Sequence, residues 1–230
     1  MTEPKLLVPG VYFLGFEIGQ VYLWARQEDV TVIDTGISGS AAAIMRAIDM
    51  IGRRPEDVKE ILLTHFHDDH IGGAAELVQL TGATLIAHPA DAAVIRGQQS
   101  ETPPDLTERE RQMLAAIFPR VPRAERVDVD KEVLEGDAIA GGAGSIEGVP
   151  GHTPGSIALF LPALGVLFTG DTIAFSNGRP VLGPFNVDRA EAIQSVRKQA
   201  RLEFEVACFG HGPPIVGGAS GRIRALAETL

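Results

Sequence analysis

The order of apolar and polar positions in the first half of the chain predicts strands that alternate with helices. Five short runs rich in β-branched, aromatic and aliphatic residues are typical of strands: residues 10–16, 21–26, 30–36, 58–65 and 83–88. Three stretches between or after them have the apolar spacing or the start and stop signals of helices: residues 38–52, 72–80 and 89–97. This alternation is typical of an α/β or α+β protein, in which helices cover a sheet.

The second half of the chain shows the same two kinds of element. Its predicted strands lie within residues 144–152, 156–171 and 206–212, and its predicted helices within residues 188–200 and 220–230. The glycine-rich residues 141–145 do not open a helix, so they indicate a hairpin turn rather than a phosphate-binding loop. Because both halves contain strands and helices, we expect one domain over residues 1–230, with a two-layer sheet core and helices outside.

Residues 97–124 interrupt this alternation. The segment starts polar and proline-rich, and it then holds one helix between helix breakers. Thr107 and Glu110 fit a capping box at the start of that helix, because the hydroxyl can accept from the third amide while the carboxylate reaches back. The helix carries an apolar stripe of Met113, Leu114, Ile117 and Phe118. Three roles stay open for the segment, namely packing onto the body, a lid over a site, or a contact in a homodimer.

Composition and charge exclude several classes of protein. Hydrophobic residues make up 45% of the 230 residues and charged residues 22%, as in ordinary globular proteins, and the apolar runs are too short to span a bilayer. The net charge of −10 counts against nucleic acid as a partner, because nucleic-acid affinity comes mainly from Lys and Arg. Residues 1–10 lack the pattern of a secretory signal, and the single cysteine, Cys208, excludes an internal disulfide. We therefore expect a cytoplasmic protein that acts on a small molecule and not on a membrane.

Histidine and aspartate are concentrated at the end of the strand predicted at residues 58–65. Residues 65–70 read HFHDDH, and H-x-H-x-D-H is expected by chance on the order of 10⁻⁴ times in a chain of this composition. If the strand stays extended, His65 and His67 point to the same side, because side chains alternate along a strand. If a helix then begins, Asp69 and His70 lie about 100° apart around its first turn and point elsewhere. This layout predicts two neighbouring metal sites, since imidazole and carboxylate are common metal ligands.

Three further candidate ligands lie in turns directly after strand-like runs. His152 lies in GVPGHTPGS, Asp171 in VLFTGDT and His211 in VACFGHGPP, where glycine and proline favour turns and close approach of the backbone. Five of the six histidines thus belong to one pattern. With the first four residues they make seven candidate ligands, enough for two divalent metal ions with an open position between them.

The order of these motifs resembles that of the metallo-β-lactamase-fold hydrolases over almost the whole chain. H-x-H-x-D-H is followed by GHTPGS, TGD and GHG, as in that family. The resemblance implies an αββα four-layer sandwich, with the metal loops along one edge of the paired sheets. The implied ligands are His65, His67 and His152 for the first metal, Asp69, His70 and His211 for the second, and Asp171 as the bridge between them. Zinc is the first choice for both ions, and manganese, iron and cobalt are alternatives, because these donor types suit all four.

The resemblance further implies hydrolysis of an ester, lactone or thioester carbonyl, as in the glyoxalase II and lactonase branches, with a metal-bridging hydroxide as nucleophile. Asp69 is the candidate catalytic residue, because it can orient the hydroxide and carry its proton. β-Lactam hydrolysis is a minor alternative, since zinc β-lactamases of the namesake branch carry a cysteine at the position of Asp171 or lack the acid. Acyl-homoserine lactonases of the best-known type have a tyrosine where this chain has Ala174, which counts against that particular assignment.

Two alternatives come from other classes of protein. Persulfide dioxygenases also keep the motif residues, but they use one iron, and the matching positions here are His65, His152 and Asp171. Ligand types that zinc and iron share leave this alternative open. A non-catalytic metal-binding module is the remaining alternative, and a complete set of seven ligands counts against it.

Several residues near the motifs fall outside the ligand set. Asp34 follows a strand-like run and is expected either to support the site or to form a plain turn. Asp68 stands where a helix N-cap would be, so we expect it to cap the helix or face solvent. His88 is expected to be structural or at the surface. Phe175 and Phe185 are expected either to line an apolar substrate pocket or to belong to the core.

Overall fold

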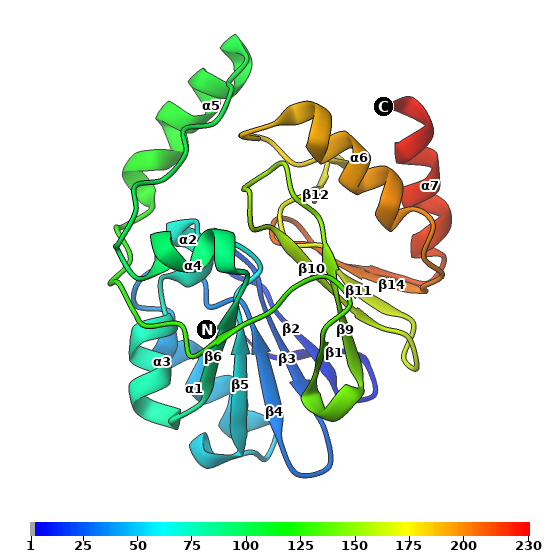
Figure 1. Ribbon diagram of the computed structural model, residues 1–230. Coiled ribbons are helices and arrows are strands. Elements are labelled where there is room, and N and C mark those ends of the chain that lie inside the picture. The colour runs from blue at the N-terminus through cyan, green and yellow to red at the C-terminus, as the bar shows by residue number, and fades with distance from the viewer. Residues whose placement is uncertain (1–2) are drawn as a thin grey trace.

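Two β-sheets lie face to face in the computed structural model, which describes residues 3–230 (Figure 1). The first sheet has seven strands in sequence order: β1 (Lys5–Val8), β2 (Val11–Leu14), β3 (Val21–Ala25), β4 (Val30–Ile33), β5 (Val58–Leu62), β6 (Thr84–Ala87) and β7 (Lys131–Glu132). Strands β1 to β4 are antiparallel, whereas β4 to β7 run parallel. The first half of the chain therefore builds a complete mixed sheet.

The second sheet comes from the second half of the chain. Its six strands lie in the order β15 (Ile215–Val216), β14 (Val206–Cys208), β11 (Val166–Phe168), β10 (Ile157–Leu161), β9 (Gly144–Gly148) and β8 (Ala138–Ile139). A separate hairpin pairs β12 (Ile173–Ser176) with β13 (Arg179–Leu182). The predicted turn at residues 141–145 is confirmed, because β8 and β9 form an antiparallel hairpin around it.

Helices cover the outer faces of both sheets. On the first sheet lie α1 (Ala41–Met50), α3 (Ala74–Thr81) and α4 (Pro89–Ile95), and on the second lie α6 (Arg189–Gln199) and α7 (Ala219–Thr229). Two further helices are α2 (Asp68–Ile71) and α5 (Glu108–Ile117), and 3₁₀ turns span Pro55–Asp57, Phe118–Arg120 and Ala140–Gly142. The expected four-layer αββα sandwich is confirmed (Figure 1). No helix described within residues 3–230 combines the length and the apolar character needed to cross a membrane.

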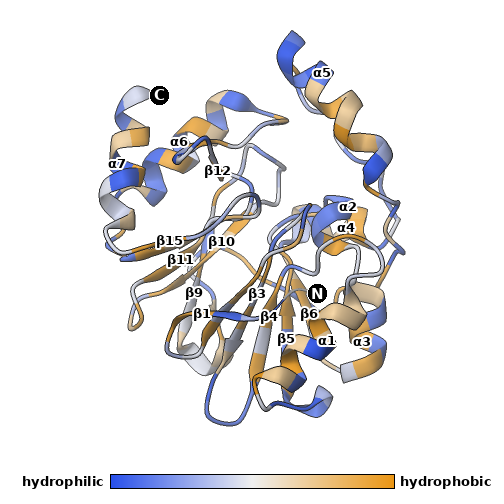
Figure 2. Cartoon of the chain, turned by 180° about the vertical axis from the view of Figure 1, so that it is seen from behind, coloured by the Kyte–Doolittle hydropathy of each residue, from blue (hydrophilic) through white to orange (hydrophobic). Residues whose placement is uncertain are grey.

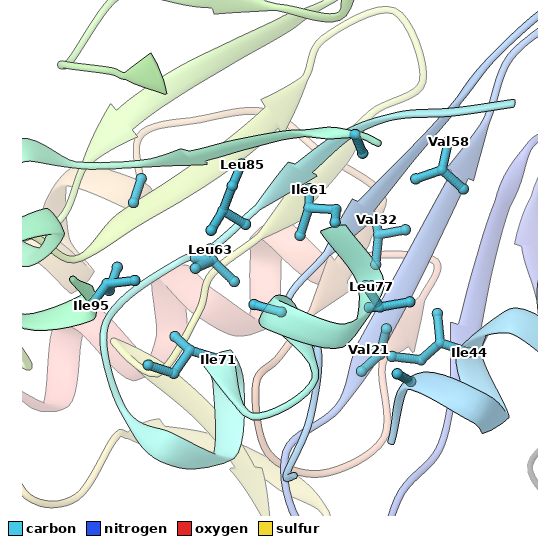
Figure 3. Close-up of a cluster of buried hydrophobic side chains, with 14 of the residues drawn as sticks. Val21, Val32, Ile44, Val58, Ile61, Leu63, Ile71, Leu77, Leu85 and Ile95 are labelled. Atoms are coloured by element: carbon cyan, nitrogen blue, oxygen red, sulfur yellow. The ribbon is translucent and has the colours of Figure 1, made fainter. Parts of the chain in front are cut away.

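The buried apolar side chains form three layers that match this architecture. One cluster lies between the first sheet and its helices, with Ile44 of α1, Leu77 of α3 and Ile61 of β5 among its members (Figure 3). A second cluster joins the two sheets, and a third lies between the second sheet and α6 and α7. Apolar residues accordingly concentrate along the strands (Figure 2). Burial on both faces explains why the central strands are continuous apolar runs.

The strands that precede the candidate ligands end at one edge of the sandwich. In the first sheet β4 and β5 run parallel. In the second sheet β11 and β14 run parallel, and β9 has the same direction because both β9 and β11 are antiparallel to β10. In such sheets, sites form where loops leave the carboxyl ends of neighbouring strands.

Several elements differ from the sequence-based expectations. The strand predicted at residues 58–65 ends at Leu62, so its extension through His67 is wrong. The β12–β13 hairpin was not predicted, and β1, β7 and β15 were also missed. These strands have two to four residues and lie at sheet edges or in a separate hairpin, where the apolar pattern is weak.

Residues 97–124, here named the arm, stand apart from the sandwich. Helix α5 extends away from both sheets in two opposite views (Figures 1 and 2). Its capping box between Thr107 and Glu110 is confirmed, and Glu110 is its buried residue. Phe118 is 67% exposed and Met113 is 39% exposed, whereas Leu114 and Ile117 are partly buried, so packing of the whole stripe onto the body stays a prediction.

Candidate metal centre

Seven His and Asp side chains converge at the shared edge of the two sheets. Their nitrogen and oxygen atoms form three overlapping groups, and within each group the atoms lie no more than 4.8 Å apart. The groups are His65, His67 and His152; His65, His70 and Asp171; and Asp69, His70 and His211. The structure therefore places all the candidate ligands of the sequence in one cluster, although they come from four separate connections.

The first group contains three histidines whose rings are nearly perpendicular to one another. Ring centroids of His65, His67 and His152 lie 4.7–4.8 Å apart. His67 Nδ1 and His152 Nε2 are 3.0 Å apart. His65 and His152 are buried, whereas His67 is half-buried. Rings that approach from three directions are suited to tetrahedral ligation of one ion.

The second group contains one carboxylate and two histidines. His211 Nε2 lies 3.2 Å from Asp69 Oδ2 and 3.4 Å from His70 Nε2. Two nitrogens bound to one tetrahedral ion at about 2.0–2.1 Å are about 3.3 Å apart. Asp69 and His211 are partly exposed, while His70 is fully buried. Solvent and small molecules thus reach this group from the side of Asp69 and His211.

Asp171 lies between the two groups. Its Oδ2 atom is 3.1 Å from His211 Nε2, 3.6 Å from His152 Nε2 and 4.0 Å from His65 Nε2. Its Oδ1 atom is 3.4 Å from His70 Nε2. A single buried carboxylate therefore faces histidines of both groups, which is the position that a bridging ligand requires.

The hydrogen bonds around His65 leave one ring nitrogen without a partner. The Thr64 hydroxyl donates to Asp34 Oδ2 at 2.8 Å, so its oxygen accepts from His65 Nδ1 at 3.0 Å. His65 Nε2 then carries a lone pair, and this buried atom has no hydrogen-bond partner among the residues that the structure describes. Because buried polar atoms are almost always satisfied, this lone pair fits a bound cation.

Burial and mutual charge shift the pKa values of these residues in opposite directions. Burial and the neighbouring His67 lower the pKa of His152 to about 3, so that its ring is neutral near neutral pH and one of its nitrogens is unprotonated. Burial opposes charge on His211, but the Asp171 and Asp69 carboxylates outweigh it and raise its pKa to about 10 without a cation. Burial likewise opposes charge on Asp171, yet His211 and His70 hold its pKa well below the usual range. A divalent cation would replace these protons as the partner of the carboxylates.

Asp34 orients two of the histidines. Its Oδ2 atom accepts from His70 Nδ1 at 2.9 Å, and its Oδ1 atom accepts from the Thr64 amide at 2.8 Å. With Nδ1 bonded to Asp34, His70 turns Nε2 towards Asp69, Asp171 and His211. Of the two expectations for Asp34, support of the site is the one that the hydrogen bonds favour.

Asp68, Phe175 and His88 have other roles. The expectation that Asp68 caps α2 or faces solvent is wrong, because the 13%-exposed side chain accepts from the Ala124 amide and pairs with Arg123. It therefore anchors one end of the arm. Phe175 stacks on Phe209 and packs against the apolar layer under α7, in agreement with its core interpretation. His88 has the structural role expected, since its Nδ1 accepts from the Ala90 amide at the start of α4.

Sequence reasoning missed Thr64, described above, and Asp91, which lies in α4. Asp91 is fully buried and its carboxylate contacts the turns that carry His65, His67 and His152. A signal was present, since Asp91 shares the buried face of α4 with Val94 and Ile95. An acidic residue on an apolar helix face indicates a specific buried partner.

A family model described as the metallo-beta-lactamase superfamily matches residues 14–211. This chain belongs to the metallo-β-lactamase superfamily. The match covers the whole range from β2 to His211 and so includes every candidate ligand of the centre.

Curated members of the superfamily are similar to this chain over most of its length. The probable metallo-hydrolase YflN of Bacillus subtilis is 29% identical over 90% of this chain and 86% of its own length. A hydroxyacylglutathione hydrolase of Cereibacter sphaeroides is 33% identical over 80% of this chain. The aligned part spans only 57% of that hydrolase.

Solved structures of superfamily members share the fold. The metallo-β-lactamase SMB-1 superposes with a TM-score of 0.76 at 20% identity, covering 99% of this chain and 93% of that one. BJP-1, a subclass B3 metallo-β-lactamase of Bradyrhizobium japonicum, gives a TM-score of 0.69 at 23% identity, covering 99% and 91%. At this level of identity the likeness concerns the fold alone.

Asp34→Asn is expected to weaken metal binding in this superfamily member about 10- to 100-fold, the usual effect of losing the partner of a metal-binding histidine. The Asn side chain has one oxygen and one NH₂ group in place of two oxygens, so it loses either the Thr64 or the His70 contact. Competition with a chromophoric chelator measures the affinity. Asp29→Asn is the matched control, because Asp29 pairs with Arg26 in the turn before β4, at the other end of the strand from Asp34. Equal affinities of the two variants would contradict the role of Asp34.

Proposed function

We propose that this chain is a metal-dependent hydrolase that cleaves an ester, lactone or thioester carbonyl bond of a small molecule with the help of two divalent ions. The observation that carries the proposal is the position of Asp171 between two groups of three potential ligands. The proposed ligands are His65, His67 and His152 for the first ion, Asp69, His70 and His211 for the second, and Asp171 for both. Zinc suits this donor set, as manganese, iron and cobalt also do.

The chain's own residues have distinct parts in the proposed reaction. Two bound ions, when present, would polarise the substrate carbonyl and lower the pKa of water. Asp69 is partly exposed beside His211, so its carboxylate can accept the proton of the attacking water and return it to the leaving group. Burial opposes its charge, but His70 and His211 lower its pKa, so it is ionised near neutral pH.

The arm is anchored on both sides of the centre. At its base Arg123 and Ala124 bind Asp68, directly before Asp69 in the chain. At its far end the Asp105 amide donates to the carbonyl of Asn186, and Arg189 pairs with Glu110 at 3.3 Å. The loop of Asn186 continues to Val187, whose amide donates to the His152 carbonyl. We propose that the arm is a lid, and that its half-exposed apolar stripe contacts an apolar part of the substrate.

The deciding experiment combines the metal content of the purified protein with a substrate panel. Two zinc, manganese or cobalt ions per chain, together with turnover of lactones, aryl esters or hydroxyacyl thioesters, is the expected result. A β-lactam and a glutathione persulfide complete the panel. One iron per chain with oxygen uptake on the persulfide would contradict the proposal and support the dioxygenase alternative.

Glu110→Gln is expected to raise KM about two- to fivefold while leaving kcat and the metal content unchanged. Loss of one partly exposed ion pair costs about 0.4–1 kcal/mol, which corresponds to this factor. The affected pair is the one between Glu110 and Arg189 that ties the arm to α6. Steady-state kinetics on the substrate identified above measures the change. Glu108→Gln is the matched control, since Glu108 lies on the same helix and bonds only to Arg111 and Gln112. Equal KM values for the two variants would count against the lid.

A further inference from the structure

Asp91 is a fully buried carboxylate that no step of the proposed hydrolysis uses. It lies in the first turn of α4, outside the set of metal-ligand candidates. Its Oδ2 atom accepts from the Phe66 amide at 3.0 Å and from the Thr153 hydroxyl at 2.7 Å. Its Oδ1 atom accepts from the Gly155 amide at 2.7 Å. Two backbone amides and one hydroxyl thus stabilise the carboxylate.

The three donors belong to the two turns that carry the first group of histidines. Phe66 stands between His65 and His67, and Thr153 directly follows His152. The first turn leaves β5 of the first sheet, whereas the second leaves β9 of the other sheet. The carboxylate of Asp91 is therefore shared between turns of two different sheets.

This sharing constrains the histidines through the backbone. A bond to the Phe66 amide fixes the peptide plane between His65 and Phe66, and so limits where the His65 and His67 side chains can point. Bonds to Thr153 and Gly155 hold the turn after His152 in the same way. We propose that Asp91 is a positioning residue that holds the turn of His65 and His67 against the turn of His152, so that their nitrogens stay within reach of one ion. This inference rests on the proposed metal centre.

The environment of Asp91 favours a carboxylate over an amide. All three contacts are donors, and a carboxylate accepts at both oxygens, whereas an amide of the same shape would face one N–H with its own NH₂ group. A Cβ atom on Gly155 would lie 2.5 Å from Asp91 Oδ1, so glycine allows the close approach of this turn. Thr153 is itself held by Ser156, with 2.8 Å between the two hydroxyl oxygens.

Asp91 and Asp34 act on the centre in different ways. Asp34 bonds directly to His70 of the second group and reaches His65 of the first group through the Thr64 hydroxyl, whereas the bonds of Asp91 reach only the turns of the first group. The loss of Asp91 should therefore weaken the binding of the first ion more than the binding of the second. The loss of a residue that only stabilised the core would not weaken the binding of one ion selectively.

The experiment is titration of metal-free Asp91→Asn with cobalt and zinc, beside the wild type and the control Asp130→Asn. Asp130 also accepts a backbone amide, that of Leu85, but it contacts neither turn. We expect Asp91→Asn to bind one of the two ions about 10- to 100-fold more weakly than the wild type does. The absorption spectrum of the bound cobalt should also change. The rise in melting temperature on metal binding should shrink in this variant and not in Asp130→Asn. An unchanged spectrum, affinity and metal-induced rise would overturn the inference.

A second pair of variants tests the same contact if Asp91→Asn does not fold. Thr153→Val removes one of the three donors and should weaken the same ion about two- to tenfold, as expected for one hydrogen bond. Thr153→Ser keeps the hydroxyl and should bind as the wild type does. Equal weakening by both would overturn the inference.

The wild-type titration separates this inference from the proposed function. Two ions bound by the wild type without turnover of any panel substrate would contradict the hydrolase, while selective weakening in Asp91→Asn would still support the positioning role. A wild type that hydrolyses panel substrates, together with an Asp91→Asn variant that keeps its metal affinity, would support the hydrolase and contradict the positioning role. A wild type that binds no divalent ion would overturn both.

Discussion

Asp171→Asn is expected to lower kcat/KM by about 10²- to 10³-fold, the scale of loss seen when one group of an electrostatic catalytic site is removed. In the wild type one carboxylate oxygen faces His211, His152 and His65, and the other faces His70. The amide keeps the shape of the side chain but replaces one of these oxygens by an NH₂ group, which cannot bind a metal ion. Steady-state kinetics and metal content per chain give the two measurements.

The metal content of Asp171→Asn tests whether Asp171 is a ligand shared by two ions. A shared ligand predicts that the variant retains fewer than two ions, because the amide offers one oxygen where the carboxylate offers two. Asp137→Asn is the control, since Asp137 lies in the exposed turn before β8 and, within residues 3–230, its side chain accepts only the Leu134 amide. A variant that keeps two ions and full turnover would refute the position of Asp171 between them.

Removal of the metal ions is expected to abolish hydrolysis and to lower the melting temperature by about 8–16 °C. Ligand present at about 1,000 times its dissociation constant stabilises a folded protein by about 4.1 kcal/mol, and each kcal/mol shifts the melting temperature of a chain of this size by about 2–4 °C. The reason is local, since the Asp69 and Asp171 carboxylates lie together and would then depend on protonated histidines as their partners. Dialysis against a chelator, followed by thermal unfolding monitored by circular dichroism, measures the shift.

The chelator experiment is complete only with reconstitution. Addition of zinc to the metal-free protein should restore both turnover and melting temperature, which excludes irreversible damage. Retention of full turnover after the metal content has fallen below one ion per ten chains would contradict a metal-dependent reaction.

Local patterns predicted a two-layer sheet core with helices outside, while the resemblance to the metallo-β-lactamase-fold hydrolases implied the αββα sandwich and the clustering of His65, His67, His152 and Asp171 at one edge. Apolar runs identify buried strands, and glycine-rich turns after them place polar side chains at one edge. The argument for His65 and His67 was nevertheless wrong in its geometry, since β5 ends at Leu62 and the two histidines converge through a turn. Their role as ligands stays a prediction.

The remaining features depend on contacts between distant segments. Asp91 stands in an ordinary helical pattern, and its role follows from bonds to Phe66 and Gly155, which come from other parts of the chain. The direction of the arm likewise depends on Asp68 and Arg189, which are far from it in sequence. No periodicity records such pairs, so a single sequence cannot reveal them.

The division of the ligands between the two sheets affects how the protein matures during synthesis. Residues up to Glu132 complete the first sheet and carry only four of the seven proposed ligands, while His152, Asp171 and His211 follow later from the second sheet. A chain that is still being translated thus offers a partial set, which binds metal weakly and has no bridge. Full loading awaits the docking of both halves, so a firmly held pair of ions would report that the whole polypeptide has folded.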